Sequence, residues 1–151
     1  MGAMFRWLKR LYNLLIKAGD IRYLTLPANA AAVTVTGHAT ENTKGDYAEI
    51  DDGSGITVES QIVGVHITPG AADIYHVDIA KGALGSEVVL LTDIPVERDD
   101  QETAASHAFS MPIWLPTPVE IPAGTRLSAC LATVGGASAT ATVAVILKQG
   151  Y

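Results

Sequence analysis

The chain has 151 residues, of which 48% are hydrophobic but only 6% aromatic, and it carries one cysteine. This apolar content excludes an intrinsically disordered chain, and the single Cys130 excludes an internal disulfide framework and a cysteine-based zinc site. The net charge of −6 is unevenly spread, because residues 1–22 carry five basic groups and one acidic group, which leaves a net charge of −10 on the rest. Such an acidic body would repel nucleic acid.

Residues 4–18, with the sequence MFRWLKRLYNLLIKA, are predicted to form a basic amphipathic helix. Gly19 is a suitable residue to end it. One side of this helix carries an apolar stripe, and a helix of this length needs a partner surface to be stable. We therefore predict an N-terminal arm over residues 1–19 and a β domain over residues 20–151. The predicted partner-binding residues are Met4, Trp7, Leu8, Leu11, Leu14 and Leu15.

Three kinds of partner fit the arm. Its leucine stripe could dock on another protein or on copies of itself, its basic and aromatic residues could lie on a membrane surface, and Arg6, Arg10 and Lys17 could contact nucleic acid. The well-formed stripe and the acidic body favour protein docking, with the membrane second. The apolar run of residues 14–16 is too short to predict a transmembrane helix, and a signal peptide fits poorly.

After Gly19 the apolar residues alternate with a period of two, which is typical of β-strands. The motif DDGSG at 51–55 predicts a hairpin turn, and the polar residues 95–106 predict an exposed loop. The pattern predicts an antiparallel β-sandwich or jelly roll of about eight strands. The candidate strands cover residues 21–26, 31–39, 46–51, 56–67, 73–80, 86–93, 106–115, 125–133 and 140–148.

One pattern indicates chemistry. His76 and Asp78 would project from the same face of a strand, and with His107 they could form the two-histidine, one-carboxylate iron site of jelly-roll oxygenases. Arg126 and Ser128 resemble the Arg-x-Ser pair that binds 2-oxoglutarate in that family. The alternative interpretation is a strand that turns Tyr75, Val77 and Ile79 to the core and His76 and Asp78 to water.

The C-terminal half resembles β-sandwich structural proteins of tailed-bacteriophage virions over roughly residues 56–150. The resemblance rests on "GSEVVLLTDIPV" at 85–96, "FSMPIWLPTPVEIPAGTRLSACLA" at 109–132 and "TATVAVILKQ" at 140–149. It implies a non-enzymatic virion protein without a cofactor, such as a capsid decoration or cement protein or another head or tail part. It also implies virion proteins as partners and assembly into oligomers, often trimers.

The alternative function is a carbohydrate- or receptor-binding tail or spike module, with Tyr47, Tyr75 or Trp114 as stacking residues. The stretch "LPTPVEIPAGTRLSACLA" is predicted to be architectural. Pro116 and Pro118 cannot donate ladder hydrogen bonds, so they should mark a strand end or a sheet edge. The strand that follows should bury Leu127, Ala129 and Leu131 and expose Arg126 and Ser128, or place them at an interface.

Overall fold

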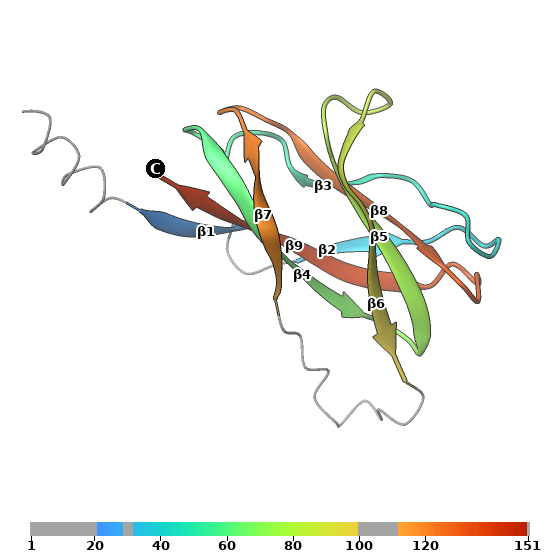
Figure 1. Ribbon diagram of the computed structural model, residues 1–151. Coiled ribbons are helices and arrows are strands. Elements are labelled where there is room, and N and C mark those ends of the chain that lie inside the picture. The colour runs from blue at the N-terminus through green and yellow to red at the C-terminus, as the bar shows by residue number, and fades with distance from the viewer. Residues whose placement is uncertain (1–20, 29–31, 100–111, 151) are drawn as a thin grey trace, which may run out of the picture.

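The computed structural model describes residues 21–28, 32–99 and 112–150, and this part of the chain is entirely β (Figure 1). It forms nine strands in two antiparallel sheets, as the alternating sequence pattern predicted. The arm of residues 1–19, with its predicted helix and its partner-binding residues, lies outside the described residues. The strands are β1 (Arg22–Leu26), β2 (Val33–Thr36), β3 (Ala48–Asp51), β4 (Ser60–Pro69), β5 (Asp73–Lys81), β6 (Val88–Arg98), β7 (Ile113–Ile121), β8 (Leu127–Thr133) and β9 (Thr140–Gln149).

The five-stranded sheet has the order β1-β9-β4-β7, and β2 pairs with the first half of β9. The four-stranded sheet has the order β3-β8-β5-β6. Arg22 at the start of β1 lies opposite Gln149 at the end of β9, so the described chain begins and ends at the same side of the molecule (Figure 1). The first described residues, which follow the arm in the sequence, therefore belong to an outer strand of the five-stranded sheet.

The chain passes repeatedly between the two sheets. β3 belongs to one sheet and β4 to the other, so the prediction of a hairpin at residues 51–55 is wrong. The segment is instead a tight turn in which the Asp51 carboxylate accepts hydrogen bonds from the backbone N–H groups of Gly53 and Gly55. The prediction of a turn at these residues is confirmed. A turn sequence does not indicate, however, whether the strands on its two sides pair with each other.

The core lies between the sheets and is made by the inward-facing residues of each strand. On β5 these are Tyr75, Val77 and Ile79, all fully buried, as the sequence alternation predicted. Leu127, Ala129 and Leu131 of β8 are also fully buried, which confirms that prediction. Aliphatic side chains dominate because β-branched and small residues fill a thin, closely packed space between two pleated surfaces.

β7 is an edge strand in the described part of the five-stranded sheet, since it pairs with β4 alone. The strand was predicted at residues 106–115, but it runs from Ile113 to Ile121 and contains both Pro116 and Pro118. Pairing skips from Trp114 to Val119 while β4 advances only from Gly64 to Ile62, so the prolines lie in a bulge. This confirms that they mark a sheet edge, where a missing N–H breaks no ladder.

β6 forms the outer strand of the four-stranded sheet and extends to Arg98. The prediction that residues 95–106 form an exposed loop is therefore wrong for residues 95–98. Pro95 lies opposite His76 of β5 and is again on an edge strand. A proline at the start of a polar stretch predicts a loop, whereas an edge strand tolerates a proline on the side without a partner.

Candidate functional site

The outer face of the four-stranded sheet carries a polar cluster, defined here as the Lys44 cluster of Lys44, Asp78 and Asp93. Lys44 Nζ lies 2.8 Å from Asp78 Oδ1 and 2.8 Å from Asp93 Oδ1, and it donates to the carbonyl of His76 at 3.0 Å. The Asp93 backbone N–H donates to the same Asp78 oxygen at 2.7 Å. Residues from a loop and from two strands are thereby joined by one ammonium group.

Strand irregularity explains how these groups meet. Between Val77 and Ile79 of β5, the facing strand β6 has one extra residue, and Asp93 there adopts a positive φ of 50°. The bulge turns the Asp93 N–H toward the carboxylate of Asp78 on the neighbouring strand. Aspartate is one of the few residues that take this conformation at modest cost.

The pKa shifts in the cluster follow from this geometry. Burial disfavours the charge on Lys44, but hydrogen bonds to Asp78 and Asp93 outweigh that effect and raise its pKa above the ordinary value. The same hydrogen bond from Lys44 lowers the pKa of Asp93. The Lys44 ammonium and the Asp93 carboxylate therefore stabilise each other's charged forms.

Cys130 and Tyr47 lie beside the cluster. The Cys130 thiol is directed toward Asp78 Oδ2 at 3.9 Å, and burial raises its pKa. Burial also raises the pKa of Tyr47, with a further contribution from its hydrogen bond to Cys130. The thiol therefore stays protonated and packs as a small residue, which agrees with the absence of a basic neighbour in the sequence.

The predicted iron-site residues are only partly placed. His76 and Asp78 share the outer face of β5, as predicted, but Asp78 is 6% exposed and is bound by Lys44. His107 lies outside the described residues. In the described part of the chain, no group of three or more His, Cys, Asp and Glu side chains could hold a metal ion.

The Arg-x-Ser pair is also engaged or covered. Arg126 Nε donates to Glu49 at 2.8 Å and Nη1 donates to the carbonyl of Gly82 at 2.8 Å. The prediction that Ser128 is exposed is wrong, since it is fully buried and its hydroxyl has no hydrogen-bond partner among the described residues. Every residue of β8 is buried, so this strand is covered on both of its faces, which alternation alone does not indicate.

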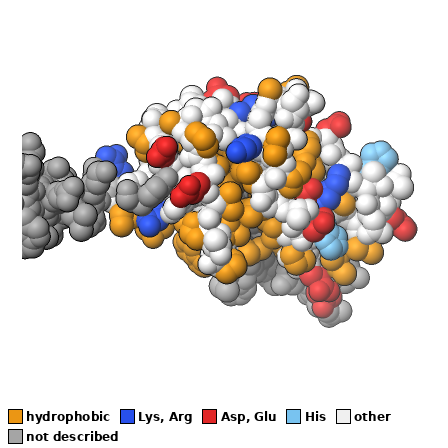
Figure 2. All heavy atoms as spheres, turned by 45° about the horizontal axis from the view of Figure 1, so that its top comes forward, with side chains coloured by type: hydrophobic (Ala, Val, Ile, Leu, Met, Phe, Trp, Pro, Cys, Tyr) orange, Lys and Arg blue, Asp and Glu red, His pale blue; other side chains and the backbone are white. Residues whose placement is uncertain are grey.

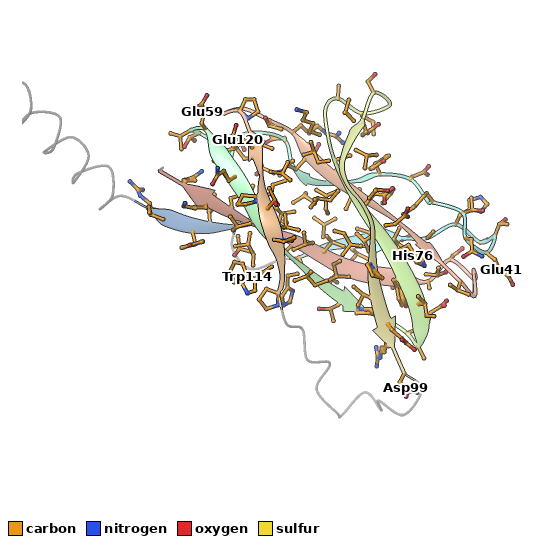
Figure 3. All side chains as sticks on the ribbon, viewed as in Figure 1. Glu41, Glu59, His76, Asp99, Trp114 and Glu120 are labelled. Atoms are coloured by element: carbon orange, nitrogen blue, oxygen red, sulfur yellow. The ribbon has the colours of Figure 1, made fainter. Side chains whose placement is uncertain are left out.

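The three proposed stacking residues differ in exposure. Tyr75 cannot stack on a ligand because it is fully buried, and its hydroxyl donates to the Ala71 carbonyl and accepts from the Ala71 N–H. Tyr47 is partly buried. Trp114 is 58% exposed on β7, and Figure 3 shows it on the same strand as Glu120.

Trp114 belongs to an apolar strip across the outer face of the five-stranded sheet, defined here as the Trp114 face (Tyr23, Gly64, Trp114 and Ile146). Gly64 of β4 lies opposite Trp114 on one side and Ile146 of β9 on the other. A Cβ atom at Gly64 would lie 3.2 Å from the indole and 3.4 Å from Ile146 Cδ1. Tyr23 of β1, 65% exposed, lies on the same face in the adjacent row, opposite Lys148.

An open groove of about 520 Å³ lies between β2 and the segment that leads into β3. It is lined mainly by hydroxyl-bearing and other polar side chains of β2 and of the segments near β3 and β9. No residue of it belongs to the predicted iron site, and Tyr47 is its only contribution from the predicted stacking residues. Its lining includes Thr34, Thr36, His38, Asp46, Tyr47 and Ser138.

Apolar side chains are also visible on the outside of the molecule, interspersed with charged ones (Figure 2). No helix of the described residues is long and apolar enough to cross a membrane. Comparisons with protein-family models, with curated proteins and with solved structures found no match.

Proposed function

We propose that the protein is a non-enzymatic structural component of a virion, such as a capsid decoration or cement protein or another head-associated part. In this proposal the β domain is the rigid body and residues 1–19 attach it to its partners. The observation that carries it is the strand order. β1-β9-β4-β7 facing β3-β8-β5-β6 matches the order of a jelly roll, an architecture that recurs in viral capsid domains.

The state of the reactive side chains supports a structural role. Asp78 and Asp93 share the Lys44 ammonium, and Arg126 is held by Glu49 and a backbone carbonyl. These groups tie strands of the four-stranded sheet to each other and to neighbouring loops. Because jelly rolls also host lectins and cupins, this engagement of the polar groups is a second support for a structural role, beside the strand order.

Exposed apolar residues at separate places support an assembly role. Besides the Trp114 face, Leu84 and Val88 at the β5–β6 hairpin are 76% and 57% exposed. We propose that the protein acts as a homo-oligomer, a trimer, with these surfaces available for contacts in the particle. Such surfaces on soluble proteins commonly mark interaction sites.

The test is to locate and count the protein in purified particles of the virus that encodes it. Quantitative mass spectrometry should find it there, with hundreds of copies for a cement protein or a few for a vertex or tail part. A virus carrying Leu8→Asp with Leu15→Asp should yield particles that lack the protein, while one carrying Asn13→Asp should retain it. Absence of the natural protein from the particles would refute the proposal.

A second candidate function is carbohydrate binding, and the polar groove is the observation that favours it. Hydroxyl, imidazole and carboxylate groups line it together with the aromatic Tyr47, a combination suited to a polyhydroxylated ligand. A glycan array with the full chain tests this directly. A hit that is weakened by Asp46→Ala and unaffected by Glu59→Ala would support the groove, whereas no hit across diverse glycans would count against it.

A further inference from the structure

On the Trp114 face, the side chains of Trp114 and Tyr23 are exposed and Ile146 is half-buried, whereas Gly64 between Trp114 and Ile146 is buried. Ile146 and Gly64 lie on β9 and β4, and Tyr23 and Trp114 lie on the two flanking strands. Ala144 of β9, in the next row opposite His66, is buried. The row of Ile146, Gly64 and Trp114 thus spans β9, β4 and β7 and meets Thr25 on β1, and Tyr23 lies in the adjacent row beside Lys148.

We infer that in the unassembled protein this face binds residues 4–18 of the same chain. The segment is predicted to be a helix with an apolar stripe, and it joins the described structure directly before β1, the strand that carries Tyr23. Gly19 and Asp20 form the connection to Ile21, which is itself 43% exposed. A glycine at this point allows the chain to reverse direction over the sheet.

The lengths of the two partners agree. A helix of 15 residues is about 22 Å long at 1.5 Å per residue. Four adjacent strands about 4.8 Å apart place β1 and β7 roughly 14 Å from each other. A helix that crosses the strands from β1 therefore covers Ile146, Gly64 and Trp114 and extends just past the edge of the sheet.

The charges agree with this direction. Lys148 lies opposite Tyr23, near the place where the C-terminal end of the helix would lie, and a cation favours that negative end. Glu120 lies on β7 at the far side of the face, in the row of Tyr23, Lys148 and Gln61 (Figure 3). The basic half of the arm, with Arg6, Lys9 and Arg10, would reach this carboxylate.

The inference rests on the predicted helix and on the Trp114 face, not on the proposed virion function. An arm held on its own domain would hide the apolar stripe until a partner in a particle takes it over. In a domain-swapped arrangement, the apolar stripe of one copy would instead cover the Trp114 face of another copy. Dilution separates these two arrangements.

The experiment uses Trp114 as the probe in the full chain. Trp7→Phe leaves Trp114 as the single tryptophan and keeps an aromatic residue in the stripe. Acrylamide quenching of its fluorescence is then measured with Leu11→Asp, which disrupts the stripe, and with Asn13→Asp, which adds the same group on the polar side. Far-UV circular dichroism checks that the β domain is intact in each variant.

The inference predicts that Leu11→Asp raises the quenching constant of Trp114 several-fold, and that Asn13→Asp leaves it unchanged. The protection should be the same at micromolar and nanomolar protein concentration. Equal quenching in the Trp7→Phe background with and without Leu11→Asp would overturn the inference. Protection that disappears on dilution would also overturn it, because the face would then be covered by a second copy.

Discussion

Lys44 and Asp78 are 34 residues apart in the sequence, and their Nζ and Oδ1 atoms are 2.8 Å apart on the outer face of the four-stranded sheet. Asp78 is almost fully buried, whereas the Lys44 side chain retains 31% of its exposure. The pair thus joins a loop outside the sheet to a central strand, and Asp93 extends the link to the edge strand β6. Its contribution to stability can be measured.

Replacement of Asp78 by alanine should lower the free energy of unfolding by about 2–3 kcal/mol, because it leaves the Lys44 ammonium and the Asp93 N–H without their shared acceptor. Urea unfolding followed by circular dichroism measures the change. Glu59→Ala, at an exposed carboxylate, is the control and should stay within about 0.5 kcal/mol of the natural protein. A loss no larger than that of the control would contradict a stabilising role for the pair.

The decrease in the free energy of unfolding at acidic pH should depend in part on Asp93. Its pKa is lowered from the ordinary 3.8 by the hydrogen bond from Lys44, so its contribution is present above pH 3.8 and is lost as the pH falls through the folded-state pKa. Lys44 behaves oppositely: its raised pKa makes its contribution complete below pH 10.5 and lost as the pH rises through the folded-state pKa. The bridge is therefore intact at neutral pH.

Urea midpoints measured between about pH 2 and pH 7 test this linkage. The natural protein should lose stability below about pH 4, and Asp93→Asn should reduce the part of that loss that comes from the bridge. Glu59→Gln should keep the natural profile, because Glu59 is exposed and directly precedes β4, in the other sheet from Asp78 and Asp93. Superimposable acid limbs for the natural protein and Asp93→Asn would show that the bridge does not contribute.

The fold class could be predicted from the sequence because alternation reports directly on the inward side of each strand. On β5, Tyr75, Val77 and Ile79 lie in the core as their spacing indicates. The pairing of strands could not be predicted, since the turn at 51–55 has the same local chemistry whether it closes a hairpin or crosses between sheets. The prolines of β7 fitted either a strand end or a sheet edge, and only the pairing of β7 with β4 distinguishes the two.

The polar clusters were less accessible to prediction. Lys44 stands in a polar stretch with no sequence signal that connects it to Asp78, and the bulge at Asp93 depends on the neighbouring strand. The burial of Ser128 likewise depends on what covers the outer side of the sheet. Each of these features is set by contacts between distant segments, and a single sequence contains no direct record of them.

Leu127 and Ser128 are neighbours on β8 with opposite expected effects. Leu127 is fully buried between the sheets, so Leu127→Ala should lower the free energy of unfolding by about 3 kcal/mol, and Leu127→Asp should prevent folding. The Ser128 hydroxyl is buried without a hydrogen-bond partner among the described residues, so Ser128→Ala should be neutral or stabilising by up to about 1 kcal/mol. Thermal and urea unfolding measure both, and a clear destabilisation by Ser128→Ala would reveal a partner for the hydroxyl.

Pro116 and Pro118 should protect the free edge of β7 from pairing with other chains. Their lack of an N–H and the bulge they occupy prevent a long, flat edge strand, which is a common site of edge-to-edge association. The double variant Pro116→Val with Pro118→Val should fold, because both residues are exposed, but it should associate as its concentration rises. Light scattering coupled to gel filtration measures the mass, with Pro122→Val in the following turn as the control. A mass that stays equal to that of the natural protein over the same concentrations would argue against a protective role for these prolines.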